Sequence, residues 1–95
     1  MEGTKVKKGI NILEEILREN KGKDAIISIS HKLYGPQKIK CKLDYIFDDE
    51  RIGFRVNGQE IFIYKPDIID YGIKDGIYFA DNMMEIKIKL NMAVN

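Results

Sequence analysis

The sequence has a single cysteine, a single histidine and no tryptophan. With only Cys41 and His31, it has no intramolecular disulfide and no zinc module built from several Cys and His ligands. No apolar run approaches the roughly 20 residues that a membrane-spanning helix needs. The N-terminal residues also lack the apolar segment of a secretory signal peptide. We therefore expect a cytoplasmic protein with no metal, no cofactor and no membrane partner.

Positive and negative side chains are nearly equal in number. Sixteen Lys and Arg residues against 15 Asp and Glu residues give a formal charge of +1, with a sequence pI near 7.8. A sequence-independent nucleic-acid binder usually has a pI above ~9, so this balance disfavours that class. The charges are nevertheless unevenly distributed, with +5 over residues 1–42 and −5 over residues 43–81. We expect one basic and one acidic region.

The composition predicts one folded domain over residues 1–95, because the 95 residues are 44% hydrophobic and show no repeat or linker. Val6, Ile10, Leu13 and Leu17 fall on one stripe of an amphipathic helix, which we place at residues 4–20. Gly9 costs this helix about 1 kcal/mol relative to alanine, so its first two turns are the weakest part.

From Asp24 onward the apolar period changes from 3.6 to 2, which predicts strands. One apolar face runs from Ala25 to Leu33, and a longer strand covers residues 39–47, with a turn at residues 34–37 between them. Both apolar faces consist of odd-numbered residues. The connecting loop must therefore contain an odd number of residues, unless a bulge supplies the difference.

The strongest local signal is Asn57-Gly58, which lies between two β-rich runs. A two-residue turn of this type requires positive φ at both positions, which Asn and Gly tolerate. It predicts that Gly53 lies opposite Phe62 and that Arg55 pairs with Glu60. Phe62, half-exposed beside a glycine, then needs a cover from the helix or from a partner chain.

Pro66 cannot donate a backbone hydrogen bond, so the strand before it ends or bends at Lys65. Short strands are predicted at residues 68–73, 77–80 and 84–90. The fold class is therefore α+β and mostly antiparallel β. It consists of a helix over residues 4–20, a small, strongly bent barrel of five to six strands over residues 24–73, and a C-terminal strand extension over residues 74–95.

Catalysis is not predicted. Cys41 and His31 lie on the apolar face of adjacent predicted strands, where a thiol behaves as a small hydrophobic group. The sequence has no nucleophilic serine motif and no phosphate-binding glycine loop. The acidic run Asp48-Asp49-Glu50 lacks the spacing of a calcium loop, and we interpret it as a solvated turn.

Lys38, Lys40 and Lys42 form a basic stripe with period 2. Such a stripe occurs in phosphate recognition and also on solvated strands that avoid aggregation. Aromatic residues beside basic ones favour nucleic-acid binding because bases stack on them, and Tyr34, Phe62 and Tyr64 are candidates.

The order of elements, from the helix to the short strand at residues 68–73, resembles the Sm-like small barrels, in particular the bacterial Hfq branch, over about residues 10–73. The alternating run Ile39–Asp44 is similar to the first Sm motif. The run Ile61-Phe62-Ile63-Tyr64-Lys65-Pro66-Asp67-Ile68 is similar to the second motif, around its Tyr-Lys-His core. Pro66 stands at the place of the histidine in this core.

The resemblance implies a barrel capped by the helix and a ring in which the fourth strand of one subunit pairs with the fifth of the next. It also implies an RNA pocket at Tyr64 and Lys65, to which we add the nearby Arg51. Our first hypothesis is a non-catalytic module that forms homo-oligomers and binds single-stranded RNA. The alternative is a protein-interaction adaptor without nucleic-acid binding. Its docking surface would include Phe62, and the lysine stripe at Lys38, Lys40 and Lys42 is a further candidate interaction surface.

Overall fold

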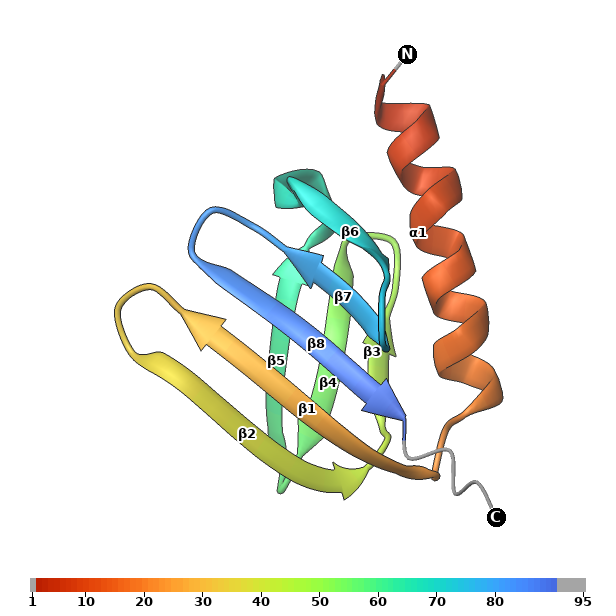
Figure 1. Ribbon diagram of the computed structural model, residues 1–95. Helices are drawn as coiled ribbons and strands as arrows, with labels where there is room; N and C mark the ends of the chain where they lie inside the picture. The colour runs from red at the N-terminus through yellow and green to blue at the C-terminus, as the bar shows by residue number, and fades with distance from the viewer. Residues whose placement is uncertain (1, 91–95) are drawn as a thin grey trace.

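The computed structural model describes residues 2–90, with the side chains of residues 9–90. Within these residues, one α-helix is followed by eight strands and a short 3-10 helix, and every strand pair is antiparallel (Figure 1). The elements in chain order are α1 (Glu2–Glu19), β1 (Asp24–His31), β2 (Gly35–Lys42), β3 (Tyr45–Phe47), β4 (Arg51–Val56), β5 (Gln59–Tyr64), the 3-10 helix η1 (Lys65–Asp67), β6 (Asp70–Ile73), β7 (Ile77–Ala80) and β8 (Met84–Leu90). The predicted class, a helix followed by mostly antiparallel strands, is confirmed.

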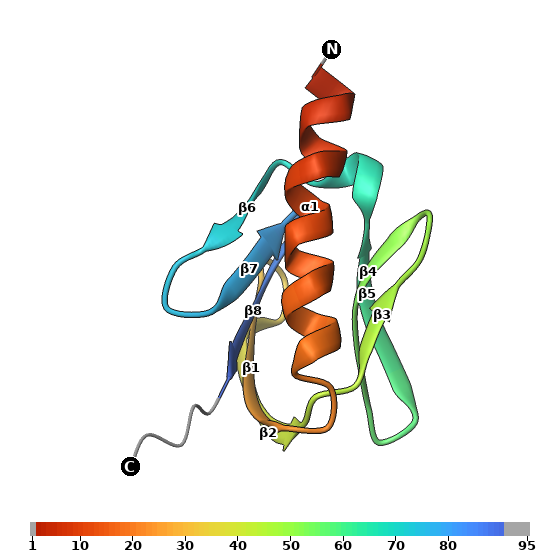
Figure 2. The same cartoon turned by 90° about the vertical axis from the view of Figure 1, so that its right-hand side faces the viewer.

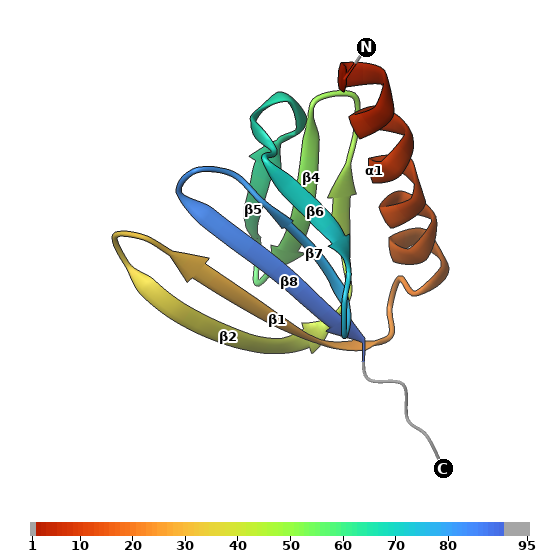
Figure 3. The same ribbon diagram turned by 45° about the horizontal axis from the view of Figure 1, so that its top comes forward.

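The strands form two sheets. The larger sheet has the order β2-β1-β8-β7-β6 and the smaller one the order β3-β4-β5. Figure 3 shows the larger sheet in front of the smaller one. Within residues 2–90 no strand pairing joins the two sheets into a closed barrel, so the Sm-like barrel stays an expectation. β8 pairs with β1 on one side and β7 on the other, so residues 84–90 lie inside the larger sheet.

The strand predicted over residues 39–47 is divided. β2 ends at Lys42 in the larger sheet, and β3 begins at Tyr45 in the smaller one. Between them, the Leu43 carbonyl accepts a hydrogen bond from the Gly22 N–H at 2.8 Å. The Asp44 carbonyl accepts one from the Arg55 N–H at 2.7 Å. These bonds hold the chain where it passes from one sheet to the other.

Helix α1 spans the space between the two sheets along one side of the molecule (Figure 2) and contacts both β3 and β6. Ile10, Leu13 and Leu17 are buried in the core, as their stripe predicts. The side chain of Val6 lies outside the described residues. Gly9 lies against the ring of Tyr71, whose atoms occupy the place where a methyl group at Gly9 would be.

The β1–β2 loop consists of residues 32–34, because His31 is opposite Gly35. The predicted odd number is confirmed, but the predicted turn at residues 34–37 is wrong. Gly35, with φ of 79°, already begins β2. Leu33 therefore lies in the loop and is 71% exposed, instead of extending the apolar face of β1.

The β4–β5 hairpin has the predicted register. Asn57 and Gly58 have φ values of 52° and 80°, Gly53 lies opposite Phe62, and Arg55 lies opposite Glu60. Pro66 lies in η1, which follows the end of β5. The next strand begins at Asp70 rather than Ile68, and Ile69 is 64% exposed.

The main core is apolar and lies between the helix and the inner faces of the two sheets. No polar or charged residue within the described part is buried. The buried core residues are Ile10, Leu13, Leu17, Ala25, Ile27, Ile29, Leu43, Ile52, Phe54, Ile63, Ile77, Phe79, Ile86 and Ile88.

Candidate nucleic-acid interface

The smaller sheet brings three of the predicted site residues together on its outer face. Arg51 of β4 lies opposite Tyr64 of β5. The Arg51 guanidinium lies 4.9 Å from the ring centre of Phe62. The rings of Phe62 and Tyr64 meet edge to face, with 5.2 Å between their centres. We call Arg51, Phe62 and Tyr64 the Phe62 cluster.

Gly53 allows β5 to approach β4 closely beneath this cluster. A methyl group at Gly53 would overlap the carbonyl oxygen of Ile61 and lie 2.5 Å from the Cα atom of Phe62. Register places Ile46 of β3 beside Gly53, and Ile46 is only 2% exposed. A second, smaller apolar layer therefore lies on the outer face of the smaller sheet.

Lys65, the other predicted RNA-binding residue, begins η1 directly after β5. Its ammonium group lies 3.6 Å from the centre of the Phe47 ring, in a cation–π contact. Its backbone N–H donates to the Glu50 carbonyl at 2.7 Å. Lys65 thus holds the end of β5 near the turn between β3 and β4.

Carboxylates surround the cations of the smaller sheet. The Arg51 Nε–H donates to Asp48 at 2.9 Å, and Arg51 also pairs with Glu60 at 3.3 Å. Arg55 pairs with Glu60 at 3.0 Å and with Asp44 at 3.6 Å. A phosphate group at Arg51 would have to displace these carboxylates.

The same contacts shift the pKa values of these groups. The hydrogen bond from Arg51, followed by one from the Glu50 backbone N–H, lowers the pKa of Asp48 to about 2. The bond to Asp48 raises the pKa of Arg51. The pKa of Glu60 is lowered, chiefly by its hydrogen bond from Arg55. Both carboxylates are therefore charged at neutral pH and neutralise the guanidinium groups.

Lys38, Lys40 and Lys42, the other predicted surface residues, are not part of this arrangement. They lie on β2 in the larger sheet, on the face opposite the core. β8 adds Lys87 and Lys89 to the same face, because Ser28 of β1 is opposite both Lys38 and Lys87. Ile26 is likewise opposite both Lys40 and Lys89. We call these five lysines and the β1 residues between them the lysine face.

The outer face of the larger sheet also carries carboxylates, and two of the five lysines pair with carboxylates. Lys42 pairs with Asp24 at 2.7 Å and Lys89 with Asp75 at 3.6 Å, and all four side chains are largely exposed. Lys38, Lys40 and Lys87 form no ion pair with any residue that the structure describes. The register also places two further carboxylates, which form no ion pair with a described residue, on this side of the sheet, Glu85 opposite Ser30 and Asp70 opposite Ala80.

Tyr78 and the serines of β1 add hydroxyl groups to this face. Tyr78 of β7 lies opposite Lys87, and its hydroxyl end lies beside Gly72. The sequence alone does not indicate the roles of Lys87, Lys89 and Tyr78. The alternation of residues 84–90 places the two lysines on a polar face, but only the pairing of β8 with β1 brings them beside β2.

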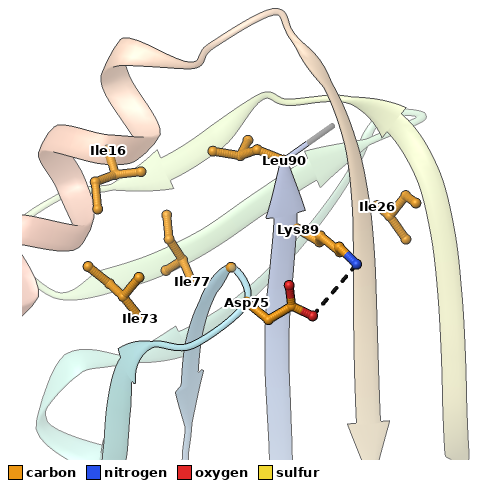
Figure 4. Close-up of a pocket in the computed structure, with 8 residues that line it drawn as sticks. Ile16, Ile26, Ile73, Asp75, Ile77, Lys89 and Leu90 are labelled. Atoms are coloured by element: carbon orange, nitrogen blue, oxygen red, sulfur yellow. Dashed lines mark ion pairs between the residues drawn. The ribbon is translucent and has the colours of Figure 1, made fainter. Parts of the chain in front are cut away.

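A groove of about 520 Å³ lies at the end of β8, beside the lysine face (Figure 4). Ile16 of the helix, Ile73, Ile77 and Leu90 line it from one side, and Ile26 from the other. The Asp75–Lys89 ion pair lies at the groove. Its walls are mostly aliphatic, and its charged groups pair with each other.

The two residues considered for nucleophilic chemistry are separated. Cys41 lies opposite Ala25 near one end of the β1–β2 hairpin, whereas His31 lies opposite Gly35 at the other end. Burial raises the pKa of the Cys41 thiol, which lowers its thiolate fraction. His31 Nδ1 accepts a hydrogen bond from the Leu33 N–H at 3.0 Å, within the loop.

The acidic turn at Asp48-Asp49-Glu50 has a structural role. Asp48 Oδ1 accepts the backbone N–H groups of Glu50 and Arg51 at 2.9 and 2.8 Å, which closes the turn. Within the described part of the chain, no group of three or more His, Cys, Asp or Glu side chains is arranged to hold a metal ion. Among the same residues, no helix is both long and apolar enough to cross a membrane.

No protein-family model, curated protein or solved structure matches this chain.

Proposed function

We propose that the protein is a non-catalytic binding module for single-stranded RNA and that the lysine face of the larger sheet is its binding surface. The observation that supports this most is the pairing of β8 with β1. It places Lys87 and Lys89 on the same face as Lys38, Lys40 and Lys42. Three of these five lysines, Lys38, Lys40 and Lys87, form no ion pair with a described residue, which favours a polyanion.

Charge favours the lysine face over the Phe62 cluster. Around the cluster, Arg51 and Arg55 already pair with carboxylates, and the Asp48-Asp49-Glu50 turn adds negative charge. A phosphate there meets repulsion and paired cations. On the lysine face it meets Lys38, Lys40 and Lys87, which form no ion pair with any described residue.

Spacing favours a single strand. Alternate residues of a β-strand lie about 7 Å apart, and strands two steps apart in a sheet lie about 10 Å apart. Lysines on β2 therefore repeat at a distance comparable with consecutive phosphates of an extended single strand. The outer face of this open sheet also leaves the bases free to contact Tyr78 and the apolar side chain of Ile26.

The proposal is tested by measuring the binding of short U-rich and A-rich RNAs with fluorescence anisotropy at two salt concentrations. We expect the triple variant Lys38→Gln, Lys40→Gln, Lys87→Gln to bind at least ten-fold more weakly than the wild type at low salt. The matched control, Arg51→Gln, Arg55→Gln, Lys65→Gln, removes the same number of positive charges from the smaller sheet and the adjoining η1. It is expected to change the affinity less than three-fold.

Three results of this experiment contradict the proposal. They are absence of wild-type binding at either salt concentration, a greater loss in the control variant, and equal losses in both. Circular dichroism of each variant shows whether the substitutions preserve the fold.

A protein-interaction role is the second candidate. The Phe62 cluster favours it, because Tyr64 is 49% exposed and the outer side of β5 has no paired strand within residues 2–90. Binding of RNA to the lysine face leaves this surface accessible, so the two roles are compatible.

A further inference from the structure

The two sheets leave four strand edges open within residues 2–90, at β2, β6, β3 and β5. An open edge carries unpaired N–H and C=O groups that can pair with another chain. The four edges differ in length and in the side chains that they would place opposite a second copy. These differences show which edge is suited to self-association.

Three of the edges are poorly suited. β3 and β6 have three and four residues, and both contact the helix. β2 has eight residues, but its lysines recur at every second position. In a twofold antiparallel pairing of β2 with its own copy, opposed residues share a face, and the pairing centred on Lys40 places Lys40 opposite itself and Lys38 opposite Lys42. Like charges directly opposite each other are destabilising, and this edge therefore rejects a second copy.

The edge of β5 is better suited to pairing with a second copy. The two-residue turn at Asn57-Gly58 makes Val56 and Gln59 a hydrogen-bonded pair. From this pair, hydrogen-bonded positions alternate along β5. The N–H and C=O groups of Glu60, Phe62 and Tyr64 consequently point away from β4. No backbone hydrogen bond to these outward groups occurs within the described part of the chain.

The side chains of β5 are complementary to those of a second β5 strand. In a twofold antiparallel pairing centred on Phe62, Phe62 lies opposite Phe62 of the copy, Ile61 opposite Ile63, and Glu60 opposite Tyr64. The outward N–H and C=O groups of Glu60, Phe62 and Tyr64 then all form hydrogen bonds with the second copy. No like charges oppose each other, and a carboxylate faces a phenol that can donate to it.

The Phe62 cluster needs such a cover. The helix packs between the sheets and does not provide one, and the Phe62 ring lies against Arg51 and Tyr64 on the outer face. A second copy at the β5 edge adds a further aromatic ring beside it. Cross-strand aromatic pairs of this kind stabilise sheets.

We infer that two copies of this chain associate through antiparallel pairing of β5 with β5, forming a six-stranded sheet across a twofold axis with Phe62 at its centre. This contact is isologous, so it closes at two subunits and does not propagate into a ring. It uses the smaller sheet, whereas the proposed RNA surface lies on the larger one. The dimer is therefore independent of RNA binding.

Sedimentation equilibrium of the protein without RNA tests the inference. We expect a reversible monomer–dimer equilibrium for the wild type. The variants Phe62→Glu and Phe62→Lys are each expected to be monomeric, because like charges would meet on the axis. An equimolar mixture of the two variants is expected to restore the dimer, since opposite charges then meet.

The matched control is Gln37→Glu, which adds the same charge to the β2 edge and is expected to leave the dimer unchanged. A measurement on the wild type avoids the effect of any variant on folding. In amide hydrogen exchange, protection of Glu60, Phe62 and Tyr64 should rise with protein concentration. A wild type that stays monomeric up to millimolar concentration overturns the inference. So does an assembly larger than two, a dimer that persists in both charged variants, or outward amides whose protection is independent of concentration.

Discussion

At the scale of single residues, two small features hold the smaller sheet in shape. Gly53 lets β5 approach β4 so closely that a side chain cannot fit. Asp48 closes the β3–β4 turn through two backbone N–H groups and fixes the Arg51 guanidinium at the same time. The sequence shows a glycine opposite Phe62, and the structure gives the reason for it.

Substitution of Gly53 should be costly because the atoms it would meet are backbone atoms, which cannot move aside alone. We expect Gly53→Ala to lower the free energy of unfolding by about 3 kcal/mol, the upper part of the usual range for overpacking. Urea denaturation measures this. Gly58→Ala is the comparison: Gly58 has φ of 80° but open space around it, so only the conformational cost of about 1 kcal/mol applies. Equal losses in the two variants would argue against the close approach.

The pKa of Asp48 gives the stability a defined dependence on pH. It falls from an ordinary value of 3.8 to about 2 in the folded protein. The stabilisation by this carboxylate is therefore present above about pH 4 and is lost as the pH falls through 2. In urea denaturation between pH 5 and 2, we expect the wild type to lose more stability than Asp48→Asn. Parallel curves for the two proteins would contradict this assignment.

At the scale of elements, the sequence predicts well the structures that depend on neighbouring residues. It predicts poorly the structures that depend on contacts between distant residues. The Asn57-Gly58 hairpin depends on its own residues, and every predicted pair in it is confirmed. The strand at residues 39–47 fails as a prediction because Leu43 and Asp44 bond to the Gly22 and Arg55 N–H groups, far away in sequence. The position of the β1–β2 turn also differs, because Gly35 extends β2 by pairing with His31.

The candidate site follows the same division. The sequence indicates that Lys38, Lys40 and Lys42 share one polar face, and the structure confirms their place on β2. The sequence cannot show that Lys87 and Lys89 lie on the same face as these three lysines, because that depends on which strand β8 pairs with. Likewise, the resemblance points to Tyr64 and Lys65, beside which the sequence places Arg51. Only the geometry shows that Arg51 is held by Asp48 and Glu60.

At the scale of the whole molecule, the chain is nearly neutral, but its positive and negative side chains gather in different places. The net charge of +1 arises from basic and acidic segments, and the fold places the lysine face on the larger sheet and the acidic turn beside the smaller one. A balanced composition therefore does not exclude a polyanion as ligand. It predicts that binding is confined to one face.

Confined binding has a measurable dependence on salt. For single strands, the slope of log affinity against log salt concentration is about −0.7 per phosphate contact. The Lys38→Gln, Lys40→Gln, Lys87→Gln variant should therefore have a slope shallower than that of the wild type by about 2. Anisotropy titrations at several salt concentrations measure this. An unchanged slope with a weakened affinity would mean that these lysines do not contact phosphates.

The most direct test of the proposed RNA surface is nuclear magnetic resonance mapping of the ¹⁵N-labelled protein during titration with a short U-rich RNA. We predict that the backbone signals of Ser28, Lys38, Lys40, Tyr78 and Lys87 shift progressively, while those of the Phe62 cluster stay constant. Shifts confined to Arg51, Tyr64 and Lys65, or no shifts at all at low salt, would contradict the account.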